Sequence, residues 1–211
     1  MKKKAAIPVI IAIACLLLIS AVAVTHRSKP LIICSVDRSR STDPVRLRYN
    51  NIVDVLIKRI QSGTRLLVYR FDTAVSQVYD GYPTKPRDLW QVQDRQLKPI
   101  AKRRGTRLDM MLKQITQVTL PNSSEQTIGI VVITDGGNDG RPLAPYAMAL
   151  GKDKRIRAVW LVGLQAHHRL RLDNEFRTVL GDRLVTSGLD DVANGIDRFN
   201  ELMRKERHDA Q

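Results

Sequence analysis

The feature that most restricts the fold of this chain is an alternation of short apolar segments with segments of helical periodicity. LIICSV (31–36), TIGIVVIT (127–134) and RAVWLVGL (157–164) contain few polar side chains. Such runs are typical of parallel strands, because helices cover both faces of a parallel sheet. Further strands are predicted at 65–71 and 183–187, with a short alternating strand at 74–80.

Segments with apolar residues three and four positions apart separate these strands. Helices are expected from Asp43 and Pro44 onward, at 89–100, from Thr106 onward, at 142–150, at 170–180, and from Leu189 to Met203. Asp43 and Pro44 suit an N-cap and a first helical position, and Gly151 and Gly181 suit helix ends. This order predicts an α/β domain with a doubly wound, mostly parallel sheet and helices on both faces, in a Rossmann-like arrangement.

The amino-terminal segment differs from the rest of the chain. Residues 5–24 carry no charge and follow MKKK (1–4). About 20 apolar residues are enough to cross the hydrocarbon of a bilayer, so a retained transmembrane anchor is predicted. A cleaved signal sequence is the alternative, because residues 21–23 read A-x-A.

Charge around this span predicts its orientation. Three lysines precede it, whereas Arg27 and Lys29 follow it, and the side richer in Lys and Arg stays in the cytoplasm. We therefore expect a single-pass cell-membrane protein whose domain faces the periplasm or the exterior. The expected organisation is a basic segment (1–4), an anchor (5–24), a tether (25–30), one domain (31–206) and a polar tail (207–211).

Composition narrows the classes of partner. The whole chain has a net charge of +14; the first 30 residues hold five Lys or Arg and no acid, which leaves 30 basic against 21 acidic residues, or +9. The domain shows no interleaving of aromatic and basic residues of the kind that stacks nucleobases, so nucleic acid is not an expected partner. Cys15 falls in the span and Cys34 in the first strand, so a disulfide between them is not expected.

Oxygen-bearing side chains gather where predicted strands end or helices begin. Asp37, Ser39 and Ser41 follow the first strand at alternate positions, Thr106 opens a helix, and Asp135 follows the apolar run at 127–134. In doubly wound sheets, ligands bind beyond the carboxyl ends of the strands. These oxygens are therefore candidate ligands of a hard cation.

Each of these residues also has an ordinary structural interpretation. Ser39 and Ser41 could cap the first helix, and Asp135 could start a turn before two glycines. Thr106 could be an N-cap, with Asp109 completing a variant capping box. The residues alone leave these alternatives open.

Taken together and in this order, the motifs resemble the von Willebrand factor A (VWA) family and its metal-ion-dependent adhesion site (MIDAS). The D-x-S-x-S motif of the family matches Asp37, Ser39 and Ser41, its G-T pair matches Gly105 and Thr106, and its T-D-G matches residues 134–136. The resemblance covers residues 31 to about 203. It implies a VWA fold, and it implies that Asp37, Ser39, Ser41, Thr106 and Asp135 hold Mg²⁺ or Mn²⁺ directly or through water.

The resemblance also implies an open coordination position that a carboxylate of an acidic partner protein completes. Arg40 and Arg104 stand where family members often have glycine, and neither position is a metal ligand in the family. Together with Arg38 and Arg107 they predict a basic, partner-binding rim around the cation. The expected function is a membrane-anchored, metal-dependent adhesion or assembly module.

An enzyme is not expected. A phosphatase of the haloacid dehalogenase type would need a second Asp at the position of Ser39, and no G-x-G-x-x-G follows the first strand. An EF-hand loop starting at Asp135 would need Glu where Tyr146 stands, and His167 and His168 are expected in an exposed loop. The remaining alternative is a structural subunit of a membrane-associated complex whose metal site binds no partner.

Overall fold

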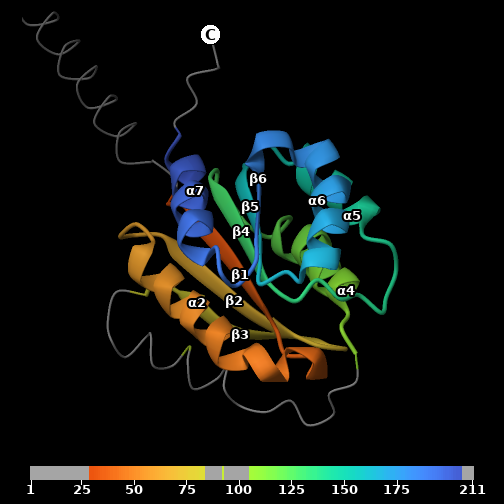
Figure 1. Ribbon diagram of the computed structural model, residues 1–211. Coiled ribbons are helices and arrows are strands. Elements are labelled where there is room, and N and C mark those ends of the chain that lie inside the picture. The colour runs from red at the N-terminus through yellow and green to blue at the C-terminus, as the bar shows by residue number, and fades with distance from the viewer. Residues whose placement is uncertain (1–28, 84–91, 93–104, 206–211) are drawn as a thin grey trace, which may run out of the picture.

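The computed structural model describes residues 29–83, 92 and 105–205, which form a single twisted sheet between two layers of helices (Figure 1). The strands run in the order β3-β2-β1-β4-β5-β6, and all are parallel except β3. Their bounds are β1 (Leu31–Asp37), β2 (Arg65–Phe71), β3 (Val75–Gly81), β4 (Ile128–Ile133), β5 (Ile156–Val162) and β6 (Leu184–Ser187).

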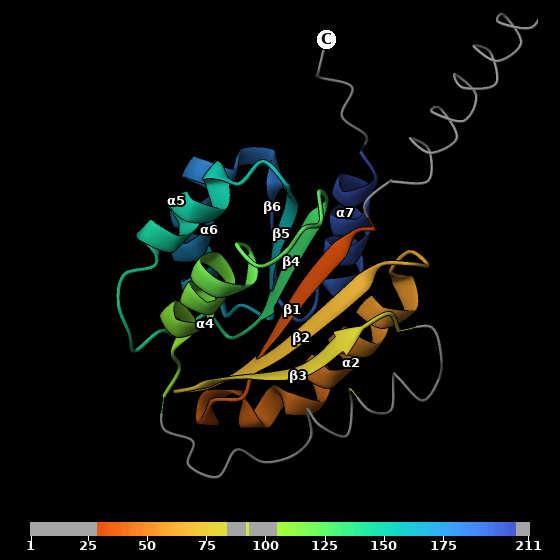
Figure 2. The ribbon, with the colours of Figure 1, turned by 180° about the vertical axis from the view of Figure 1, so that it is seen from behind.

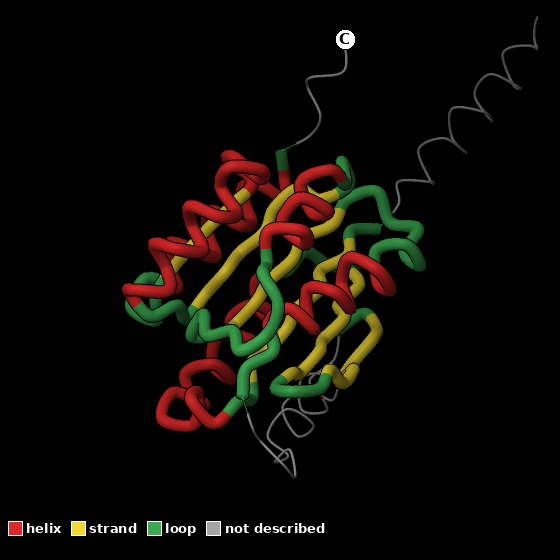
Figure 3. Tube along the Cα trace, turned by 90° about the vertical axis from the view of Figure 1, so that its right-hand side faces the viewer, coloured by secondary structure: helices red, strands yellow, loops and turns green. Residues whose placement is uncertain are grey.

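In the described part of the chain, five α-helices connect the strands and cover both faces of the sheet. They are α2 (Arg46–Arg59), α4 (Leu108–Gln114), α5 (Ala144–Lys152), α6 (Ala166–Leu180) and α7 (Val192–Arg204). Helices α2 and α7 lie on one face, and α4, α5 and α6 lie on the other (Figures 2 and 3). The predicted doubly wound, mostly parallel sheet is confirmed.

Strand β1 lies in the middle of the sheet and shows why the fold needs apolar strands. Leu31 and Ile33 pack into the core beneath α4, α5 and α6, whereas Ile32, Cys34 and Val36 pack into the core beneath α2 and α7. All seven residues of β1 are buried. The thiol of Cys34 is free, and burial raises its pKa to about 12, so it remains protonated and inert at neutral pH.

Strand β3 is the antiparallel edge, because only a tight turn separates it from β2. Asp72 N–H donates to the carbonyl of Ala74 at 3.1 Å, and the Asp72 carboxylate accepts a hydrogen bond from Ala74 N–H at 2.9 Å. A turn this short can join only antiparallel neighbours. The predicted strand at 74–80 is therefore confirmed with a shift of one residue.

The helix predicted from Thr106 onward is shorter in the structure than its apolar pattern indicates. It begins at Leu108 instead of Thr106, and after Gln114 the chain continues as a π-helical turn, η2 (Ile115–Thr119). A π turn accommodates one extra residue, which moves the apolar face by one position. Val118, which an uninterrupted α-helix would place on the apolar face, is consequently 45% exposed, and Thr119 is buried instead.

Three other boundaries differ from expectation. Asp43 and Pro44 lie in a 3₁₀ turn, η1 (Arg40–Val45), and the α-helix starts only at Arg46. Helix α5 continues through Gly151 to Lys152. Helix α6 begins at Ala166, so the two histidines at 167 and 168 lie in its first turn and not in a loop as predicted.

Some predictions fall on residues outside those that the structure describes. These include the anchor (5–24), most of the tether (25–30), the helix at 89–100 apart from Val92, Arg104, and the tail. Within the described ranges, no helix combines the length and the apolar character needed to span a bilayer.

Close packing between α7 and β5 generates a stability prediction. Trp160 is fully buried, its indole N–H donates to Ser187 Oγ at 2.9 Å, and its ring lies 6.1 Å from that of Phe199. A Cβ on Gly195 would lie 2.7 Å from Trp160 Nε1. Gly195→Ala should therefore lower the free energy of unfolding by about 1–3 kcal/mol, although alanine favours helices.

Urea unfolding of the full chain in detergent micelles measures this effect. Asn194→Ala, an exposed neighbour in the same helix, serves as the control and should change stability by only about 0.5 kcal/mol. If the Gly195→Ala protein were as stable as the control, the space between Gly195 and Trp160 would be large enough for a methyl group.

Candidate metal centre

The predicted ligands lie on three loops that meet at one end of the sheet. Asp37 is the last residue of β1, and Asp135 follows the neighbouring parallel strand β4, in which Ile133 pairs with Val36. Thr106 lies just before α4. The parallel register of β1 and β4 therefore brings the first and third loops together, because the carboxyl ends of parallel strands share one edge.

Asp37 is fully buried, and its carboxylate is held by neutral donors. The hydroxyl of Thr134 donates to Asp37 Oδ2 at 2.7 Å, and the backbone N–H of Ser39 donates to Oδ1 at 2.9 Å. Burial raises the pKa of Asp37 to about 6, and the nearby negative charge of Asp135 adds to this rise, although the hydrogen bonds from Ser39 and Thr134 oppose it. A bound cation would favour the ionised form.

The two serines of the first loop face each other instead of capping a helix. Ser39 Oγ and Ser41 Oγ lie 3.0 Å apart, and neither makes a side-chain capping bond to η1 or α2. The loop is held by Thr42, whose hydroxyl donates to the carbonyls of Ser39 at 2.9 Å and Asp37 at 3.3 Å. Adjacent ligands of an octahedral Mg²⁺ at about 2.1 Å lie about 3.0 Å apart, so the serine pair matches that spacing.

Thr106 is held in place through its backbone, which leaves its hydroxyl available. Its N–H donates to Asp139 Oδ2 at 2.9 Å, and its carbonyl accepts from Asp139 N–H at 2.8 Å. The helix begins two residues later without a side-chain cap, and the carboxylate of Asp109 pairs with Arg107. The alternative of an N-cap with a capping box at Thr106 is therefore wrong.

The second and third loops meet beside Gly137. A Cβ at Gly137 would lie 3.2 Å from Asp135 Oδ1 and 3.6 Å from Thr106 Oγ1, so these two oxygens border the same small space. Asp135 Oδ1 also accepts from Gly137 N–H at 2.9 Å, which is the local turn that the sequence allowed. The turn and a ligand role are compatible, because a carboxylate has several lone pairs.

Several residues that support the site were not singled out in the sequence as site residues. Asp139 anchors Thr106, Gln165 N–H donates to the carbonyl of Asp135 at 3.1 Å, and Arg171 donates to the carbonyl of Gly136 at 3.0 Å. His168 packs against Gly136; burial lowers its pKa most, and the positive charges nearby lower it further. The contacts of Gln165, His168 and Arg171 depend on the start of α6, which the sequence pattern placed at residue 170 instead of 166.

The predicted basic rim is smaller than expected. Arg38 is only 2% exposed, and its guanidinium donates to Asn50 at 2.6 Å, so it does not belong to an exposed rim. Arg107 is half-buried and binds both carboxylate oxygens of Asp109, at 2.8 and 2.9 Å. Arg40 is exposed beside the serines, whereas Arg104 lies outside the described residues.

The set of donors restricts which metal fits. In the part of the chain that the structure describes, no three His, Cys, Asp or Glu side chains gather as a metal cluster. The candidate site instead combines two carboxylates with three hydroxyls. Such oxygen donors suit hard cations such as Mg²⁺ and Mn²⁺, whereas structural zinc sites are rich in Cys and His.

Comparison with known proteins places the fold. No family model matches the sequence, and no curated protein matches it. Among solved structures, a von Willebrand factor type A protein from Catenulispora acidiphila superimposes with a TM-score of 0.60 at 17% identity, over 84% of this chain and 42% of that one. The chain thus spans less than half of that protein.

Two other structures extend the comparison. An aerotolerance-related membrane protein from Bacteroides fragilis, with multiple mutations to serines, has a TM-score of 0.65 at 13% identity, over 83% of this chain and 99% of that one. Proximal thread matrix protein 1 from the mussel byssus, with a zinc-occupied MIDAS motif, has a TM-score of 0.59 at 13% identity, over 84% and 45%. At these identities the similarity shows the fold alone: the chain has a VWA-like fold.

The geometry predicts which substitutions remove cation binding without unfolding the domain. Ser41 is exposed, and Thr106 is held through its backbone, so Ser41→Ala and Thr106→Val remove one candidate ligand each and leave the core intact. Each should weaken Mg²⁺ binding at least ~10-fold. Calorimetric titration of the full chain in detergent micelles measures the affinity.

Thr73→Val provides the matched control, because Thr73 is an exposed hydroxyl residue in the turn between β2 and β3. This variant should bind Mg²⁺ like the wild type. If both ligand variants also kept the wild-type affinity, the hydroxyls would not be ligands.

The raised pKa of Asp37 predicts how cation binding depends on pH. Its pKa in the folded, metal-free domain is about 6, above the ordinary 3.8, so ionisation of Asp37 costs folding free energy as pH rises through this window. A cation offsets that cost, and protons compete with the cation below about pH 6. The Mg²⁺ affinity should be constant from pH 8 to pH 7. At lower pH it should fall, and below the pKa of Asp37 the fall should approach ~10-fold for each pH unit.

Titrations at pH 7.5, 6.5 and 5.5 test this profile. Asp43→Ala, which removes an exposed carboxylate near the serines, should leave the profile unchanged. The same affinity at pH 7.5 and 5.5 would contradict a buried, proton-competing ligand.

Proposed function

We propose that this chain is a protein-binding module that depends on a divalent cation. The cation, Mg²⁺ or Mn²⁺, is held by Asp37, Ser39, Ser41, Thr106 and Asp135. When bound, it supplies a positive centre that accepts a carboxylate oxygen from an acidic residue of a partner protein.

The observation that carries this proposal is the approach of candidate ligand oxygens from separate loops at the carboxyl end of the sheet. The serine hydroxyls lie 3.0 Å apart, and Thr106 Oγ1 shares a small space with Asp135 Oδ1. Neither the serines nor Thr106 make the capping bonds that would explain their presence structurally. The zinc-occupied MIDAS motif of the byssus protein, which has the same fold, supports a divalent cation at such a site.

The charge of the donors favours an acidic partner. The two carboxylates formally balance the two positive charges of the cation, and the three hydroxyls add no negative charge. Little repulsion therefore opposes a further carboxylate from a partner at an open coordination position. Exposed Arg40 beside the serines adds a positive charge at the entrance. Arg40 attracts an acidic partner toward the site, and this attraction should weaken as salt screens the charge of Arg40.

The position of the site suits a module that stands on a membrane. Leu31 begins β1 and Asp37 ends it, so the cation loops lie at the end of the sheet opposite to the point where the chain enters the domain. We propose that residues 5–24 anchor the chain and that the domain faces the extracytoplasmic side. The fold similarity to an aerotolerance-related membrane protein is compatible with this placement.

We propose binding and not catalysis. Ser39 is buried and contacts Ser41, and among the described residues no histidine or lysine is a hydrogen-bond partner of its side chain. A serine nucleophile needs such a base.

Affinity capture of partners tests the proposal. The full chain in detergent micelles is incubated with solubilised membranes, once with Mg²⁺ and once with EDTA, and the bound proteins are identified by mass spectrometry. The proposed function predicts a defined partner that is retained with Mg²⁺, lost with EDTA and lost with Asp135→Ala.

Asp43→Ala provides the control, since it removes an exposed acid near the same loop and should retain the partner. A partner retained equally in EDTA and by Asp135→Ala would instead identify a structural subunit whose metal site does not bind it. That result would refute the proposed function.

A further inference from the structure

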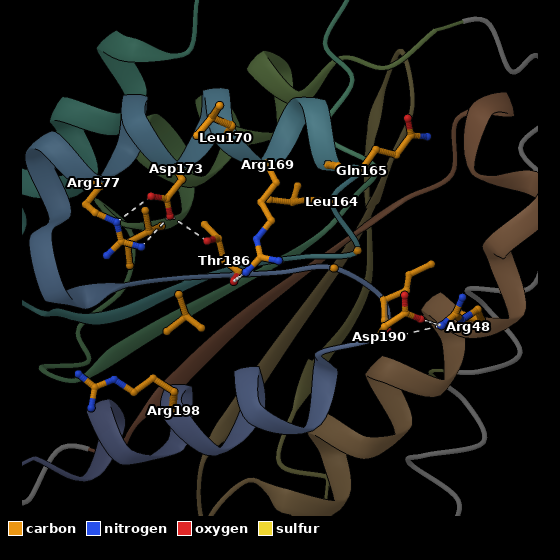
Figure 4. Close-up of a pocket in the computed structure, with 16 residues that line it drawn as sticks. Arg48, Leu164, Gln165, Arg169, Leu170, Asp173, Arg177, Thr186, Asp190 and Arg198 are labelled. Carbon is orange, nitrogen blue, oxygen red and sulfur yellow. Dashed lines mark hydrogen bonds and ion pairs between the residues drawn. The ribbon is translucent and has the colours of Figure 1, made fainter.

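A second feature, independent of the cation loops, is a large open groove at the β6 edge of the sheet. Its volume is about 890 Å³. Helix α6 forms one wall and α7 the other, and β6 runs between them (Figure 4).

The floor of the groove is apolar and includes an available strand edge. Leu164, Leu184 and Val185 line it, and no described strand pairs with the outer edge of β6. The carbonyl of Ser187 accepts from Gly163 N–H at 3.0 Å, so Ser187 faces β5. Peptide groups alternate along a strand, which makes Thr186 and Leu184 face the groove.

The outward carbonyl of Thr186 already accepts a hydrogen bond from a side chain. The guanidinium of Arg169 donates to the carbonyl of Thr186 at 3.2 Å. The Thr186 N–H and the Leu184 carbonyl also point outward, at the spacing that an added strand uses. An extended segment can therefore hydrogen-bond to β6 at these two groups.

The walls of the groove carry an excess of positive charge. Arg169 and Arg177 come from α6, Arg198 from α7 and Arg48 from α2, whereas only Asp173 and Asp190 oppose them. The lining charge is therefore positive by two. An acidic segment complements it, and a basic one does not.

Two of the acidic side chains that pair with these arginines, Asp190 and Glu201, are exposed enough for a ligand carboxylate to replace them. Arg48 pairs with Asp190 at 2.8 Å, but the Asp190 side chain is 96% exposed. Arg177 pairs with Asp173 one helical turn away, and Arg198 pairs with Glu201, which lies outside the groove. Exposed pairs such as those of Arg48 and Arg198 contribute little to stability, so a ligand carboxylate can replace Asp190 or Glu201 at small cost. Asp173 is only 25% exposed and also accepts from the Thr186 hydroxyl at 2.8 Å, so it stays beside Arg177.

We propose that this groove is a docking surface for an extended, acidic segment of a partner protein, which adds a strand to β6. Its backbone bonds to Thr186 and Leu184, its carboxylates face the arginines of both walls, and an apolar side chain contacts the floor. This site does not use the cation, so the groove and the cation loops are separate binding surfaces.

Nuclear magnetic resonance with a defined peptide tests the inference. The probe is a blocked pentapeptide with the sequence Glu-Glu-Val-Glu-Glu, which places carboxylates on both sides of an extended backbone. It is titrated into the isotope-labelled full chain in detergent micelles with EDTA, so that no cation contributes. Saturable shifts are expected at the amides of Leu184, Val185 and Thr186, with a downfield change for Thr186 N–H.

Matched peptides and variants provide the controls. The Gln-Gln-Val-Gln-Gln peptide should bind at least ~5-fold more weakly and the Lys-Lys-Val-Lys-Lys peptide should not bind, because charge complementarity is lost. The double variant Arg177→Gln and Arg198→Gln should raise the Kd of the acidic peptide ~5- to 10-fold. Lys113→Gln, an exposed charge change on α4, and Asp135→Ala should leave it unchanged.

Three outcomes would overturn the inference. Shifts confined to another face, or equal binding of the acidic and basic peptides, would show that the groove does not select an acidic strand. A change of the same resonances with protein concentration alone would make a second copy of the chain the occupant. The peptide titration is carried out in EDTA, so its failure would not bear on the cation-dependent function. That function is tested separately by the capture experiment with Asp135→Ala.

Discussion

The hydrogen bond between Thr134 and Asp37 is the interaction on which the candidate site depends. It joins the ends of β1 and β4 at 2.7 Å and fixes one oxygen of a carboxylate that is fully buried. Asp37 is the one charged residue in β1 and β4, whose other side chains are apolar apart from Ser35. The buried carboxylate therefore costs free energy in the metal-free domain, and that cost is what a cation can recover.

Much of the fold could be predicted because strands buried on both faces leave a strong sequence pattern. The runs at 31–36 and 127–134 became β1 and β4, and Pro44, Gly151 and Gly181 each lie within two residues of a helix end. The errors have local causes that depend on tertiary structure. The π turn at Ile115–Thr119 positions Thr119 so that its hydroxyl meets that of Tyr69 at 2.9 Å, a contact that no periodicity reveals.

The positions of the two aspartates could be predicted from the sequence, whereas the supporting contacts and the burial of the arginines could not. Asp37 and Asp135 could be placed at one edge because both follow predicted parallel strands, but the pairing of β1 with β4 is known only from the structure. The support from Gln165 depends on the start of α6, and the burial of Arg38 depends on α2, where its guanidinium meets Asn50. A rim of arginines was predicted from their number along the loops, but burial and pairing with Asp109 decide which charges remain available.

The central claim is that five side chains from three loops hold one divalent cation. A crystal structure of the full chain grown with Mn²⁺, with an anomalous difference map, tests it most directly. One strong anomalous peak is expected between the three loops, with the hydroxyls of Ser39, Ser41 and Thr106 at about 2.1–2.3 Å and the carboxylates of Asp37 and Asp135 in contact directly or through water. A map without a peak between these loops at saturating Mn²⁺, or with the cation bound elsewhere, would contradict the account.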